Sequence, residues 1–96
     1  MALLLFLACS SDACRQLCAD VAQKIDGCLD EWGATWEDFD VAERVAFGDR
    51  CRSEWDAERG ELEPRQLDAA TEECAAAQQD LGKVTCDELR ALYFEP

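Results

Sequence analysis

The chain contains no histidine among its 96 residues. Histidine is the commonest general base, the usual activator of a catalytic serine or cysteine, and the commonest protein ligand of transition metals. Acidic pairs such as Glu72-Glu73 are adjacent in sequence, so their carboxylates splay apart on a helix and favour a solvated face over a catalytic pair. We therefore expect a protein that is not an enzyme and that holds no metal and no cofactor.

Basic residues are also scarce, with 9 lysines and arginines against 22 aspartates and glutamates and a net charge of −13. Nucleic acids and anionic lipid surfaces are both bound through clusters of basic side chains. The composition argues against either ligand for the folded domain. It allows an unknown protein partner of cationic character, although such a charge excess is more often a solvated surface, and it leaves the oligomeric state open.

Long hydrophobic runs are missing as well, since no run approaches the roughly 20 residues that a transmembrane helix needs. The chain also lacks a Cys-x-x-Cys pair, which is typical of thioredoxin-like redox sites. Its length allows one small domain, which buries too little surface to be very stable without added cross-links.

Cysteine is what the chain has in excess, with seven residues. Cys9 closes a short apolar run at the N-terminus, and the other six form an even set, as expected for three disulfides in a small exported domain. The alternative is an intracellular metal-binding or thiol-dependent protein with reduced cysteines, although the tight knuckle of a zinc site is absent. The six expected disulfide cysteines are Cys14, Cys18, Cys28, Cys51, Cys74 and Cys86.

The N-terminal apolar run ends in Ala8-Cys9, which resembles the end of a bacterial lipoprotein signal. The resemblance implies that residues 1–9 are a signal and lipid-anchor segment with lipidation of Cys9, and that Ser10 favours the outer membrane of the cell envelope. Residues 10–96 then form a single α-helical cysteine-rich domain, which meets the membrane only through the lipid. Cleavage after Ser10 by an ordinary signal peptidase, giving a secreted protein, is the alternative.

Helical periodicity dominates the chain from Ser11 onwards. Ser11 or Asp12 can cap a first helix, whose apolar residues fall in an arc of about 140° and whose stop is Gly33. A second helix is predicted from the capping pattern at residues 35–38 to about Arg59. Its weaker periodicity leaves open a kink near Gly48 or two shorter helices.

Two further helices follow. Pro64 suits the first turn of a third helix that ends at Gly82. Thr85 and Glu88 then form a capping box for a short helix to about Tyr93. The predicted fold is all-α, a small disulfide-stapled helical bundle of three longer helices plus a short C-terminal helix.

Heights along an up-down-up bundle indicate which cysteines meet. At a rise of 1.5 Å per residue, Cys28 and Cys86 both lie about 15 Å above Cys18, so they form the favoured bridge. Cys14 and Cys18 then pair with Cys51 and Cys74 in one of two ways. Pairing Cys14 with Cys51 strains Cys14 less than pairing it with Cys74. The expected bridges are Cys28–Cys86, Cys14–Cys51 and Cys18–Cys74.

Trp36, beside the turn after the first helix, is expected to be partly exposed, and with Phe39 it could form a contact patch, although packing of both rings within the fold is the favoured interpretation. Together, these features predict an exported, envelope-tethered, acidic, disulfide-rich helical protein with a structural or protein-interaction role.

Overall fold

The computed structural model describes residues 12–94, and every regular element within this range is helical. The predicted all-α fold, with three longer helices and a short C-terminal one, is therefore confirmed. The predicted signal and lipid-anchor segment, residues 1–9, lies outside the described range. The elements are α2 (Ala13–Trp32), the 3-10 helix η1 (Trp36–Phe39), α3 (Arg44–Arg59), α4 (Pro64–Leu81) and α5 (Cys86–Phe94).

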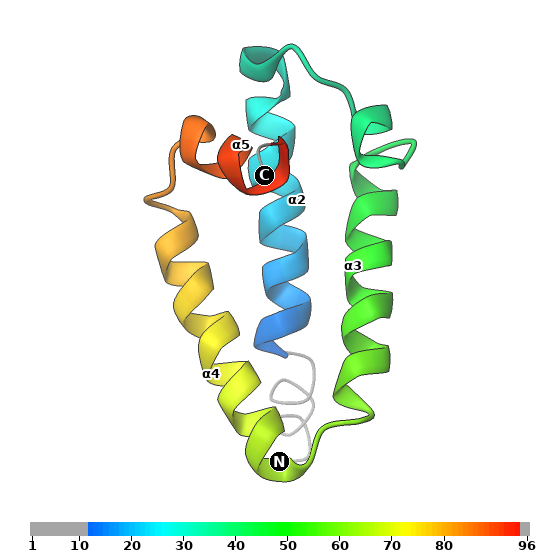
Figure 1. Cartoon of the computed structure of the whole chain (residues 1–96), viewed down its shortest axis with the longest axis vertical. Helices are drawn as coiled ribbons and strands as arrows, with labels where there is room; N and C mark the ends of the chain where they lie inside the picture. Colours follow the sequence, from blue (N-terminus) through cyan, green and yellow to red (C-terminus); the bar gives the residue numbers. More distant parts are fainter. Residues whose placement is uncertain (1–11, 95–96) are drawn as a thin grey trace, which may run out of the picture.

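The three long helices lie side by side with α2 in the middle (Figure 1). α3 and α4 each pack along α2, and α5 crosses the C-terminal half of α2 on one face. Because α2 is the neighbour that the other helices share, it must be apolar over a wide arc. This position explains the breadth of the apolar arc that its sequence shows.

Local sequence sets both ends of α2. The carboxylate of Asp12 accepts hydrogen bonds from the backbone N–H groups of Cys14 at 2.9 Å and Arg15 at 3.3 Å, and so caps the helix. At the other end Gly33 has a φ of 65°, a left-handed conformation that glycine adopts without steric cost. Both predicted ends of this helix are confirmed.

The second predicted helix is interrupted. Residues 40–43 are not helical, so a continuous helix to Arg59 is wrong, and the alternative of two shorter helices holds. The break at residues 40–43 lies before Gly48, the position of the other alternative, a kink. An unbroken helix would separate Phe39 and Phe47 by about 12 Å along its axis, whereas their ring centroids lie 5.8 Å apart in an edge-on contact. Packing of these two rings accounts for the break.

α4 and α5 begin where the sequence predicts. Pro64 occupies the first turn of α4, and the N–H of Glu63 donates to the side-chain oxygen of Gln66 at 2.9 Å. At α5, the N–H of Thr85 donates to the Glu88 carboxylate at 2.9 Å, and the N–H of Glu88 donates to Oγ1 of Thr85 at 3.1 Å. These reciprocal bonds are the predicted capping box.

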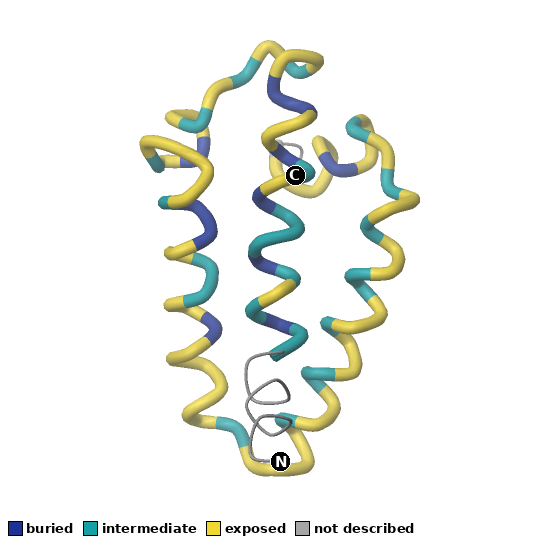
Figure 2. The backbone as a smooth tube through the Cα atoms, turned by 180° about the vertical axis from the view of Figure 1, so that it is seen from behind, coloured by how far each residue is buried: buried dark blue, intermediate teal, exposed yellow. Residues whose placement is uncertain are grey.

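The buried core lies toward one end of the molecule. We call this the packed end, where η1 and α5 cover the C-terminal half of α2; the open end comprises the N-terminal half of α2 and residues 51–77 of α3 and α4. α4 contributes no fully buried residue, and buried positions in Figure 2 follow α2 and α3 instead. The core cluster consists of Ala22, Ile25, Cys28, Leu29, Phe39, Phe47 and Leu89.

Candidate functional site

All six cysteines within residues 12–94 are joined in disulfides. One bridge connects α2 to each of α3, α4 and α5, so the central helix is covalently tied to its three helical neighbours. Two of the bridges lie at the open end and one at the packed end. The bridges and their Cα–Cα distances are Cys14–Cys74 (5.0 Å), Cys18–Cys51 (5.7 Å) and Cys28–Cys86 (5.6 Å).

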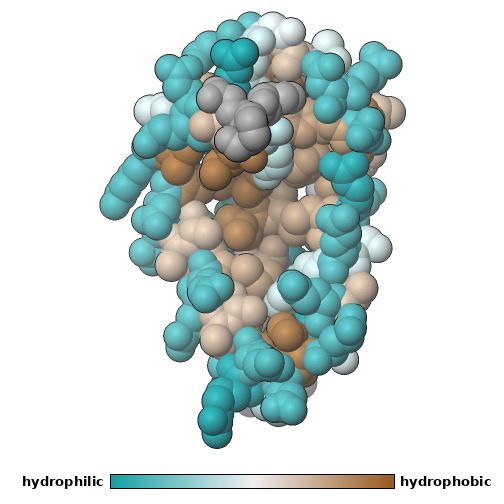
Figure 3. Space-filling model, in the orientation of Figure 1, coloured by the Kyte–Doolittle hydropathy of each residue, from teal (hydrophilic) through white to brown (hydrophobic). Residues whose placement is uncertain are grey.

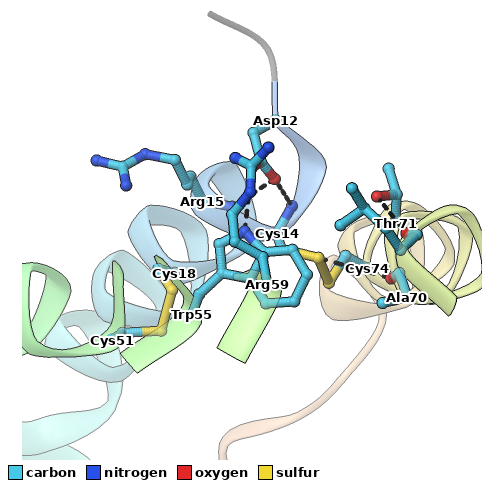
Figure 4. Close-up of a disulfide and its surroundings, with 11 residues drawn as sticks. Asp12, Cys14, Arg15, Cys18, Cys51, Trp55, Arg59, Ala70, Thr71 and Cys74 are labelled. Atoms are coloured by element: carbon cyan, nitrogen blue, oxygen red, sulfur yellow. Dashed lines mark hydrogen bonds and ion pairs between the residues drawn. A yellow bond between two sulfur atoms is a disulfide. The ribbon is translucent and has the colours of Figure 1, made fainter. Parts of the chain in front are cut away.

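The structure has the favoured bridge of Cys28, but the expected bridges Cys14–Cys51 and Cys18–Cys74 are wrong. Position along the axis of α2 does not decide whether Cys14 pairs with Cys51 or with Cys74, whereas the direction of each cysteine side chain does. At about 100° per residue, Cys14 points within about 40° of Cys28, while Cys18 points about 80° away from it. Of the two cysteines, Cys14 therefore points nearer to the side of α2 that Cys28 occupies. The bridges Cys14–Cys74 and Cys18–Cys51 leave α2 toward different helices (Figure 4).

Asp12 ties the start of α2 to the end of α3 beside the Cys14–Cys74 bridge (Figure 4). Its Oδ2 accepts hydrogen bonds from Nε1–H of Trp55 at 3.0 Å and from Nη1 of Arg59 at 2.9 Å. Burial raises the pKa of this carboxyl, but the bonds from Trp55 and from the capped backbone N–H groups, with the charge of Arg59, outweigh burial and hold the pKa below its usual value. The Asp12 carboxylate is thus charged at neutral pH and anchors the open end.

Trp36 is partly exposed as expected, but the possible contact patch of Trp36 and Phe39 does not form as an exposed surface. Phe39 is 8% exposed and belongs to the core. The Trp36 ring is half-buried, lies 5.5 Å from the ring of Phe47, and its Nε1–H donates to Asp26 at 3.1 Å. The favoured interpretation, packing of both rings within the fold, agrees with the structure, because the turn after α2 folds η1 back onto the core.

Few groups of the described range are arranged for chemistry. Within residues 12–94, no three acidic or cysteine side chains come together in a way that could hold a metal ion. Burial raises the pKa of Tyr93, against the opposing charge of Arg50, so this phenol stays neutral at physiological pH. The expectations that the protein is not an enzyme and that it binds no metal or cofactor stay predictions.

Two features of the surface escape sequence reasoning. The contact of Asp12 with Arg59 spans 47 positions of the chain, and no local pattern announces it. The second feature is a groove between α2, α4 and α5 that Leu92 and Tyr93 border. The apolar residues at the end of the short C-terminal helix were a signal that could have found it.

Comparisons with protein-family models, with curated proteins and with solved structures find no match to this chain. Among the helices that the structure describes, none combines the length and the hydrophobicity needed to cross a membrane.

Proposed function

We propose that the chain is an exported protein, tethered to the bacterial cell envelope through a lipid on Cys9, with a structural or protein-interaction role. One observation carries the exported location, namely the pairing of every cysteine in residues 12–94. Disulfides persist in oxidising compartments and are rare in the reducing cytosol. The lipid anchor rests on Ala8-Cys9, and Ser10 supports the outer membrane as the site of anchoring.

The position of Cys9 suits a tether. It precedes Asp12 by three residues, and Asp12 lies at the open end. A lipid on Cys9 would therefore hold the open end close to the membrane and direct the packed end away from it. Two or more acyl chains give stable anchoring, whereas one chain gives only reversible binding.

The role that we propose is binding and not catalysis. The chain has no histidine, and its charge of −13 attracts a cationic protein or peptide. Affinity for such a partner is expected to fall as salt rises from about 0.05 to about 0.5 M, because the screening length shortens over that range. Affinity that does not change with salt would rule out the electrostatic part of the proposal.

Intact mass of the protein isolated from its native envelope tests the location directly. We expect a chain that begins at an acylated Cys9 and carries six fewer hydrogens than its thiol form, two for each of the three bridges. An unprocessed chain with free thiols would contradict the proposal and support the intracellular, reduced alternative. A free-thiol assay on the same sample supplies an independent count.

A further inference from the structure

An apolar groove of about 510 Å³ opens between α2, α4 and α5. Hydrophobic side chains gather along the middle of this face of the molecule, between hydrophilic flanks (Figure 3). The groove is therefore a hollow in the surface with an apolar floor and polar borders. The side chains that form it include Leu17 and Val21 of α2, Ala77 and Leu81 of α4, and Leu92 and Tyr93 of α5.

The groove exposes apolar surface that a small acidic domain would be expected to cover. Leu92 is 76% exposed and Tyr93 is 44% exposed, and both lie at its border. Single exposed apolar residues are common on protein surfaces, but a hollowed apolar strip is typical of an interaction site. No other residue of the described range fills this hollow.

Charge selects among the occupants that could cover the groove. Asp80 is the one charged residue of its lining, and α4 carries four acidic residues against the single basic residue Arg65. A second copy of the chain would bring another charge of −13 to a chain that already carries −13, so like-charge repulsion disfavours it. A cationic partner is attracted by the same charges.

We propose that the groove binds the apolar face of a cationic amphipathic helix. Apolar side chains spaced at i, i+3, i+4 and i+7 would enter the strip between α2 and α4, as in other helix-in-groove complexes. Lysine or arginine side chains on the flank of that helix would face Asp80 of the lining. The proposal rests on the interaction role proposed above, and it identifies the surface and the chemistry of the partner.

Three synthetic peptides test the proposal against the full oxidised chain, with backbone amide shifts followed by two-dimensional NMR. The first is an amphipathic helix of leucine and lysine, the second has the same composition in an order that scatters its leucines around the helix, and the third replaces each lysine by glutamate. We expect saturable shifts with the first peptide alone, confined to residues around Val21, Ala77 and Leu92. Added salt should weaken this binding.

Matched variants locate the binding surface. Leu92→Gln should weaken binding of the first peptide by about tenfold, because a mostly exposed leucine becomes buried on binding. Val45→Gln, at an apolar residue that is 53% exposed outside the groove, should leave the affinity unchanged. Asp80→Asn should reduce the salt dependence more than Asp68→Asn, a change of the same charge on the same helix outside the groove. Far-UV circular dichroism checks that each variant is folded.

Several results would overturn the proposal. Shifts centred on residues 37–43, a segment with four acidic side chains, would exclude the groove as the binding site but would still agree with an interaction role. Shifts of the groove residues that depend on protein concentration without peptide would identify a second copy as the occupant, and contacts from residues 3–7 would identify the chain's own N-terminal segment. Binding of all three peptides, or of none, would also exclude it. The envelope location is tested separately by intact mass and is unaffected by these outcomes.

Discussion

The packed end and the open end hold the same helices together by different means. At the packed end, η1 and α5 fold over α2, and seven residues form a continuous buried cluster that includes Cys28 of one disulfide. At the open end, α4 offers no fully buried residue, and the bridges of Cys14 and Cys18 join α4 and α3 to α2. Cross-links thus lie where burial is thin, as expected for a domain too small to build a large core.

Reduction of all three disulfides should have the largest effect. In the chain-entropy account each bridge contributes roughly 4 kcal/mol, so three together are comparable with the whole stability of a small domain. We expect loss of most of the helical signal in circular dichroism at neutral pH after reduction and alkylation. A reduced chain that keeps a cooperative thermal transition would show that burial alone suffices.

Removal of single bridges compares the two ends directly. Cys14–Cys74 and Cys28–Cys86 span nearly equal separations, 60 and 58 residues, so the unfolded-state effect of each is about 4 kcal/mol. We expect hydrogen exchange to differ: Cys14→Ala with Cys74→Ala should speed exchange in the first half of α4. The matched pair Cys28→Ala with Cys86→Ala should leave the start of α5 protected, because Leu89 still packs in the core. Equal and uniform changes in both variants would remove the distinction between the ends.

Phe39→Ala tests whether the packed end depends on burial. Loss of a buried phenylalanine typically lowers the free energy of unfolding by about 3–5 kcal/mol. Val45→Ala, at a residue that is 53% exposed, should change it by less than about 0.5 kcal/mol. Urea titration of both variants gives the comparison. Equal unfolding free energies for the two variants would contradict burial of Phe39 and would support the contact patch that the sequence left possible.

Asp12→Ala should have a smaller effect that depends on pH. Loss of the helix cap and of the acceptor for Trp55 is expected to cost about 1–2 kcal/mol near pH 7. Because the folded-state pKa is below the ordinary value of 3.8, the contribution of the charge is complete above that value and is lost as pH falls through the folded pKa. The difference in stability between wild type and variant should therefore shrink in strong acid. Asp68→Ala is the control that should show no such trend.

Much of the fold follows from local sequence. Asp12 and Gly33 delimit α2, and the pair Thr85 and Glu88 starts α5, because caps are short-range hydrogen-bonding motifs that tertiary packing seldom overrides. The break at residues 40–43 could not be predicted in this way. It depends on contacts of the rings of η1 and α3, which no periodicity within one segment reveals.

The pairing of Cys14 and Cys18 depends on the direction of their side chains, which the sequence contains but which the positions of the cysteines along the bundle axis do not use. On the first helix Cys14 points about 40° from Cys28 and Cys18 points about 80° from it, so Cys14 is the nearer of the two to the side that Cys28 occupies. The partners of Cys14 and Cys28 do belong to the consecutive helices α4 and α5. Adding side-chain direction to height selects the observed pairs. The groove could not be predicted in the same way, because it exists only where three separate helices leave a hollow.

Tryptic peptide mapping of the oxidised protein is the most direct test of the covalent framework. Cleavage after the 9 lysines and arginines places the six cysteines of the described domain on six different peptides. The structure predicts that the peptide containing Cys14 is linked to that of Cys74, and the peptide containing Cys18 to that of Cys51. A link between the peptides of Cys14 and Cys51 would contradict the account of α2 as a central helix that Cys14 joins to α4 and Cys18 joins to α3.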